Sequence, residues 1–163
     1  MVIHGEVRVN NKMLDAHMKV AETYANLSYA RRLKVGCIIV KDDRIISIGY
    51  NGTPAGWDNN CENEIEETEL CFLDQGGPGM PVTTIRLETK AEVIHAEANA
   101  IAKLARSSES GEDASMFITH APCMDCAKMI FTSGIKNVFY RNTYRNTEGL
   151  EFLLKCNVGV TQI

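Results

Sequence analysis

Two short segments constrain this chain most, because each places metal-binding side chain types at the predicted start of a helix. The first is His95-Ala96-Glu97, which opens an apolar run, and the second is Pro122-Cys123-Met124-Asp125-Cys126. Proline suits the first turn of a helix. Two cysteines three positions apart in such a turn can point both sulfurs at one centre, and the exposed amides there favour thiolates. A fold that uses both segments must therefore bring two helix starts to a single centre.

The two segments together predict a zinc site. The imidazole of His95 and the thiolates of Cys123 and Cys126 give Zn²⁺ three protein ligands, and the open fourth position is typical of catalytic rather than structural zinc. Glu97 is then available as the general acid–base group. Each segment alone is weak evidence, because CxxC pairs are common and a lone histidine is more often a core or surface residue. In combination they match the zinc-deaminase pattern.

Composition indicates one globular domain over residues 1–163. The chain has 163 residues, 45% of them hydrophobic, and a net charge of −4. This acidic balance gives no reason to expect a nucleic acid or an acidic membrane as partner. No apolar run is long enough to span a bilayer, and the first residues lack the layout of a secretion signal. We therefore expect the six cysteines to be reduced thiols or metal ligands inside a cell.

Hydrophobic periodicity predicts an α/β fold. A helix over residues 13–29 precedes a hairpin of two strands, 35–40 and 44–50. Helices and strands then alternate, at 95–105, 115–120, 122–133, 137–140, 149–155 and 158–160. This order predicts a three-layer α/β/α sandwich with a mixed central sheet of about five strands. Residues 51–92, rich in glycine, proline and charge, are interpreted as a long functional loop with one short helix.

The chain resembles the cytidine deaminase superfamily and, within it, the deoxycytidylate (dCMP) deaminase branch, phage enzymes included. Besides the two metal segments, the resemblance rests on VGCIIV, GYNGTPAGWDNNCE, HAEANAI and ITHAPCMDCAKMIFTSGI, and it covers the chain from about Ala21 to Val160. It implies a cytidine-deaminase-like fold and the hydrolysis of dCMP to dUMP and ammonia, which supplies thymidylate synthesis. It also implies a cytoplasmic homohexamer, in the bacterial host if phage-encoded, that is activated by dCTP and inhibited by dTTP with Mg²⁺.

The resemblance also implies which residues bind the substrate. Asn51 is expected to hydrogen-bond the deoxyribose hydroxyl, although an Asn-Gly pair alone reads as a plain turn. The expected phosphate ligands are Ser28, Arg32, Tyr144 and Arg145. Without the resemblance, the basic cluster around Arg32 would be interpreted as a helix end that complements the dipole. The base is expected to contact main-chain groups of Val35 and Ala96 and a wall that includes His120.

A regulatory nucleotide site is implied for the segment that follows Asn51. Its expected contacts are Gly52, Gly56, Asp58, Asn60, Glu62 and, from the end of the HAE helix, Arg106. An ordinary solvated cation is the alternative reading of Arg106. Cys61 and Cys71 flank an acidic, helix-like stretch where some phage relatives hold a second, structural zinc. Val93 occupies a position where such a site would need a ligand, so this second zinc is the less favoured alternative.

Two other functions remain open at this stage. One is a deaminase for a free nucleoside, for dCTP or for tRNA adenosine. The acidic balance disfavours tRNA, and the basic residues near Arg32 and Tyr144-Arg145 disfavour a substrate without phosphate. The other is a catalytically idle nucleotide-sensing protein of the same fold. The presence of Glu97 argues against it, because a purely structural zinc site needs no such carboxylate.

Overall fold

The central sheet has five strands in the order β2-β1-β5-β6-β7. The structure is a computed structural model that describes residues 11–71, 79–144 and 146–163. The helices are α1 (Asn11–Ala25), α2 (Ala96–Leu104), α3 (Met124–Thr132) and α4 (Glu148–Lys155). The sheet strands are β1 (Gly36–Lys41), β2 (Arg44–Tyr50), β5 (Ser115–His120), β6 (Asn137–Asn142) and β7 (Gly159–Gln162). Strand β1 runs antiparallel to β2 and β5, whereas β5, β6 and β7 run parallel, which confirms the predicted mixed sheet.

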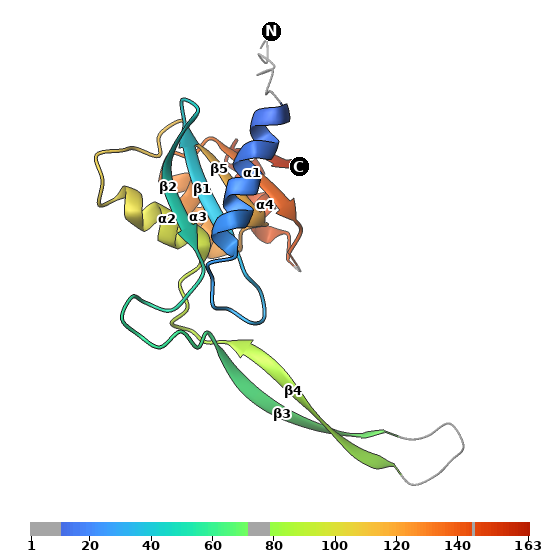
Figure 1. Ribbon diagram of the computed structural model, residues 1–163. Coiled ribbons are helices and arrows are strands. Elements are labelled where there is room, and N and C mark those ends of the chain that lie inside the picture. The colour runs from blue at the N-terminus through green and yellow to red at the C-terminus, as the bar shows by residue number, and fades with distance from the viewer. Residues whose placement is uncertain (1–10, 72–78, 145) are drawn as a thin grey trace.

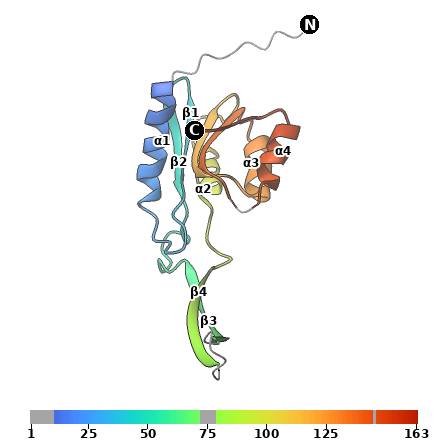
Figure 2. The ribbon, with the colours of Figure 1, turned by 90° about the vertical axis from the view of Figure 1, so that its right-hand side faces the viewer.

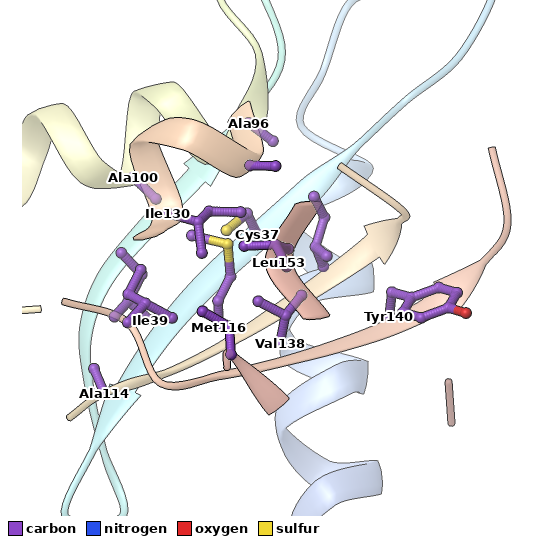
Figure 3. Close-up of a cluster of buried hydrophobic side chains, with 14 of the residues drawn as sticks. Cys37, Ile39, Ala96, Ala100, Ala114, Met116, Ile130, Val138, Tyr140 and Leu153 are labelled. Atoms are coloured by element: carbon purple, nitrogen blue, oxygen red, sulfur yellow. The ribbon is translucent and has the colours of Figure 1, made fainter. Parts of the chain in front are cut away.

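Helices cover both faces of this sheet, as predicted. Helix α1 lies on one face, and α2, α3 and α4 lie on the other (Figure 1, Figure 2). Side chains of β1 alternate between the two layers, because successive residues of a strand point to opposite faces. Ile38 packs beneath α1, while Cys37 and Ile39 join the core on the other face with Met116 and Leu153 (Figure 3). The predicted core position of Cys37 is thereby confirmed.

Two glycines let helices approach the sheet and each other closely. A Cβ atom at Gly49 in β2 would collide with the carbonyl oxygen of Ala96 in the first turn of α2. A Cβ atom at Gly149 in α4 would collide with the carbonyl oxygen of Pro122, just before α3. The starts of α2 and α3, which carry the two metal segments, are therefore seated by contacts that only glycine permits.

The prediction of a long loop with a short helix over residues 51–92 is wrong for residues 62–71 and 80–89, which form strands. Strands β3 (Glu62–Cys71) and β4 (Met80–Thr89) form an antiparallel hairpin that projects from the sandwich (Figure 1). The glutamates of β3 favour a helix locally, but its partner β4 is rich in threonine, valine and isoleucine, which favour strands. Cross-strand contacts decide the outcome: the hydroxyls of Thr68 and Thr83 lie 3.0 Å apart, and Arg86 donates to Glu67 over 2.6 Å.

The hairpin also separates the two cysteines considered for a second zinc. Cys61 immediately precedes β3 and is buried, whereas Cys71 ends the strand and is exposed. A strand of this length spans about 30 Å, so the two sulfurs cannot share one ion. Among the described residues, no helix is long and apolar enough to cross a membrane.

Candidate active site

The starts of α2 and α3 bring three metal-binding side chains together. His95 and Cys123 are the N-cap residues of these helices, and Cys126 lies in the first turn of α3. Nδ1 of His95 lies 3.6 Å from Sγ of Cys123 and 3.4 Å from Sγ of Cys126. Their ligand atoms all lie within 4.8 Å of one another.

These distances fit a tetrahedral zinc ion. With Zn–S bonds of about 2.3 Å and Zn–N bonds of about 2.0–2.1 Å, tetrahedral nitrogen and sulfur ligands lie about 3.6 Å apart. The donor set of one imidazole and two thiols is also one that zinc prefers. Within the part of the chain that the structure describes, these three residues form the one such group.

The two thiols differ in their readiness to ionise. The pKa of Cys123 is lowered to about 4, because the neighbouring Cys126 thiol and then the His95 ring stabilise its thiolate. The pKa of Cys126 is raised, chiefly because that thiol donates to Cys123 and because it is buried. One thiolate is therefore present at neutral pH, and metal binding would release the proton of the second thiol.

Glu97 lies two residues beyond His95 and lines the same cavity. Its side chain is buried, with 4% of the residue exposed. Burial raises the pKa of Glu97 to about 7, since the charged carboxylate loses its hydration. A carboxyl group that titrates near neutral pH can both accept and donate a proton, which is the property that the sequence interpretation needed.

The cavity gathers most of the predicted substrate residues. It is lined by Arg32, Leu33, Val35, Asn51, Thr89, Val93, His95, Ala96, Glu97, His120, Ala121, Cys123 and Tyr144. Of the predicted set, Ser28 does not line it, and Arg145 lies outside the described residues. Thr89 and Val93 were not predicted as site residues. Thr89 belongs to the segment interpreted as a loop, Val93 lies between that segment and His95, and nothing local in the sequence marks either as a site residue.

Asn51 and Ser28 support one wall of the cavity. Oδ1 of Asn51 accepts a hydrogen bond from the N–H of Val35 (2.8 Å), and Nδ2 donates to the carbonyl oxygen of Leu33 (2.8 Å). The buried Ser28 hydroxyl donates to the carbonyl oxygen of Asn51 (2.8 Å). The oxygen and the nitrogen of the Asn51 amide each retain one further hydrogen-bonding position beyond these contacts. Ser28 therefore supports the backbone of Asn51 and does not itself line the cavity, where a phosphate ligand was expected.

His120 and Tyr144 also line the cavity, and both are half-buried. Burial lowers the pKa of His120, so its ring is neutral at physiological pH. Its Nδ1 lies 3.2 Å from the Thr119 hydroxyl. These two residues thus add an aromatic surface and hydrogen-bonding groups without adding charge.

The predicted regulatory residues are divided between two further hollows. Gly52 and Gly56 line one, together with Asn51 and the α2 residues Asn99 and Lys103. Asp58, Asn60 and Glu62 line the other. Arg106 lines neither and is exposed just beyond the end of α2. Glu62 is only 1% exposed, which leaves it little surface to offer an effector.

Comparison with known proteins decides the family. A family model described as the cytidine and deoxycytidylate deaminase zinc-binding region matches residues 11–142, a span that includes His95, Cys123, Cys126 and Glu97. The chain belongs to this deaminase family. This chain is 40% identical over 148 residues to the deoxycytidylate deaminase of Enterobacteria phage T4. The match covers 78% of this chain and 76% of the phage protein. The chain is 34% identical over 125 residues to the human deoxycytidylate deaminase, covering 76% and 61% of the two chains.

A solved structure is similar to this chain in both fold and sequence. The crystal structure of dCMP deaminase from cyanophage S-TIM5, in complex with dCMP and dUMP, is 39% identical to it with a TM-score of 0.77. The match covers 96% of this chain and 100% of that one. The cytidine-deaminase-like fold expected from the resemblance is thereby confirmed.

Proposed function

We propose that this deaminase converts dCMP to dUMP and ammonia by zinc-dependent hydrolysis. The observation that carries the proposal is a single cavity in which His95, Cys123 and the buried Glu97 stand beside cationic and aromatic residues. The similarity to the S-TIM5 enzyme, whose structure holds dCMP and dUMP, supports the same substrate and product here.

His95, Cys123 and Cys126 would hold the zinc ion, which supplies Lewis-acid activation of a water molecule near neutral pH. Glu97 accepts one proton of that water and delivers it to the ring nitrogen N3 as the water oxygen bonds to C4 of cytosine. It then accepts the remaining proton of that oxygen and passes it to the amine, so that the C4–N bond breaks and ammonia leaves. Its pKa of about 7 suits both proton uptake and proton delivery, because neither protonation state is strongly disfavoured. The buried walls around Glu97 limit access of other water to these protons.

Substrate orientation is assigned to other residues that line the cavity with Glu97. Asn51 can direct its remaining hydrogen-bonding positions at the deoxyribose hydroxyl, and the main-chain groups of Ala96 border the base. Arg32 and Tyr144 at the cavity supply a cation and a hydroxyl donor for the phosphate, and Arg145 is assigned the same role from its sequence position. His120 forms the wall against which the base packs.

Regulation by dCTP and by dTTP with Mg²⁺ is the second part of the proposal. The hollow lined by Gly52 and Gly56 shares Asn51 with the substrate cavity. Lys103 in that hollow belongs to α2, the helix whose first turn carries Glu97. An effector bound there would thus contact two elements that also build the catalytic cavity. Asp58 and Asn60 are assigned as further contacts of the same effector. The last part of the proposal is that the protein assembles into a homohexamer in the cytoplasm.

The experiment that tests the substrate compares ammonia release from dCMP, deoxycytidine, cytidine and dCTP by the zinc-loaded protein. The proposal predicts preferential turnover of dCMP. Of these four ligands, only a monophosphate pairs with the cation and the hydroxyl donor of the cavity and leaves no charge on either partner unpaired. Equal or faster turnover of a free nucleoside would transfer the function to nucleoside deamination. Zinc-loaded protein that turns over none of them would favour the idle nucleotide sensor.

A further inference from the structure

Both ends of the β3–β4 hairpin reach the segment that borders the substrate cavity. Glu62 is the first residue of β3 and Thr89 the last residue of β4, and the two are opposite each other in the strand register. Each of them hydrogen-bonds the Arg31-Arg32 pair. The projecting hairpin therefore begins and ends beside Arg32, which lines the cavity.

Glu62 fixes the backbone of the arginine pair. Its Oε1 accepts hydrogen bonds from the N–H groups of Arg31 (3.0 Å) and Arg32 (3.2 Å). The residue is 1% exposed, and hydrogen bonds to a buried carboxylate are stronger than those between neutral groups. The Arg31 guanidinium pairs with Glu64 over 2.6 Å and lies 3.7 Å from Glu62. Arg31 is thus held against the hairpin and does not line the cavity.

Thr89 orients the side chain of Arg32. One guanidinium nitrogen of Arg32 donates to Oγ1 of Thr89 over 3.1 Å, and both residues line the cavity. Among the described residues, no carboxylate forms an ion pair with Arg32. A neutral hydroxyl therefore sets its direction while the positive charge stays available to an anion.

We infer that Glu62 and Thr89 are positioning residues that aim Arg32 at the phosphate of the substrate. Glu62 fixes the position of the Arg32 backbone, and Thr89 fixes the position of its guanidinium group. The inference deepens the proposed function and rests on it for the identity of the anion. It replaces the regulatory contact expected of Glu62 with a role at the substrate cavity.

The deciding experiment compares Thr89→Val with Thr89→Ser on substrates with and without phosphate. Valine keeps the shape of threonine but removes the hydroxyl, and serine keeps the hydroxyl. Loss of one hydrogen bond of this kind should raise KM for dCMP roughly fivefold in Thr89→Val, with kcat nearly unchanged. Thr89→Ser should restore the wild-type KM. Deoxycytidine, measured as substrate or as competitive inhibitor, should bind all three proteins equally.

Thr84→Val is the matched control, because Thr84 is an exposed threonine of the same strand and does not line the cavity. It should leave both ligands unaffected. Glu62→Ala should raise KM for dCMP more than Glu62→Gln, which keeps an acceptor oxygen. If Glu62→Ala does not fold, the Thr89 variants decide alone.

Thr89→Val overturns the inference if it leaves KM for dCMP unchanged, or if it weakens dCMP and deoxycytidine equally. Failure of the proposed function looks different, because the unmodified protein would then fail to deaminate dCMP at all. The two failures are therefore distinguished by the wild-type assay alone.

Discussion

Gly49 of β2 touches the first turn of α2 at Ala96 so closely that no Cβ atom fits between them. This contact sets the distance between α2 and the sheet. It therefore also fixes the positions of His95 and Glu97, the neighbours of Ala96 in the chain. His95 belongs to the metal group and Glu97 is the buried carboxyl group. The geometry of the proposed catalytic centre thus depends on a glycine that belongs neither to the metal group nor to the cavity lining.

Gly49→Ala should therefore lower both stability and activity. The added methyl meets backbone atoms of Ala96 and Ala100, which cannot move aside without moving α2, so we expect a loss of about 1–3 kcal/mol in the free energy of unfolding. Urea denaturation measures this loss. Gly52→Ala is the control, since a Cβ at that position meets nothing within 4 Å. Equal stability of the two variants would contradict the close contact.

Removal of zinc should abolish activity and lower the melting temperature. His95, Cys123 and Cys126 lie at the starts of α2 and α3, so a bound ion ties these helices together. Chelation followed by thermal unfolding should show a lower Tm, restored by added zinc. Cys126→Ser should lower the bound zinc content, while Cys156→Ser, at a half-buried cysteine outside the group, should leave it unchanged. Full zinc content in Cys126→Ser would exclude that residue as a ligand.

Arg106→Ala should alter regulation more than catalysis. Arg106 is exposed beyond the end of α2 and lines neither the substrate cavity nor the two outer hollows. We expect unchanged zinc content and near wild-type turnover of dCMP without effectors, but a changed response to dCTP and dTTP. Initial rates with and without each effector plus Mg²⁺ measure this. An unchanged response would leave Arg106 as an ordinary solvated cation.

The sequence predicted the sandwich well because its elements carry strong local signals. The strands over residues 44–50 and 115–120 occur with the predicted bounds, and β1 and β2 form the predicted hairpin, with Asp42 and Asp43 at its turn. Nine of the predicted substrate, metal and catalytic residues line one cavity, because the ends of β1, β2 and β5 meet the starts of α2 and α3 there.

The β3–β4 hairpin could not be predicted in the same way. The glutamates of β3 carry no alternation of apolar and polar residues, and both of its faces are largely exposed. Its strand conformation depends on pairing with β4, a partner about twenty residues away in the chain. Thr89 and the buried role of Glu62 follow from that pairing, so the sequence interpretation missed both together with the hairpin, whereas Val93 lies outside it.

The most direct test of the account is the turnover and metal content of Glu97→Gln beside the wild type. Glutamine keeps the size of glutamate but cannot exchange a proton at the cavity. We expect both proteins to bind one zinc ion and the variant to form dUMP and ammonia from dCMP at least about a hundredfold more slowly than the wild type. Wild-type turnover by zinc-loaded Glu97→Gln would contradict the role of Glu97 as the group that moves the protons.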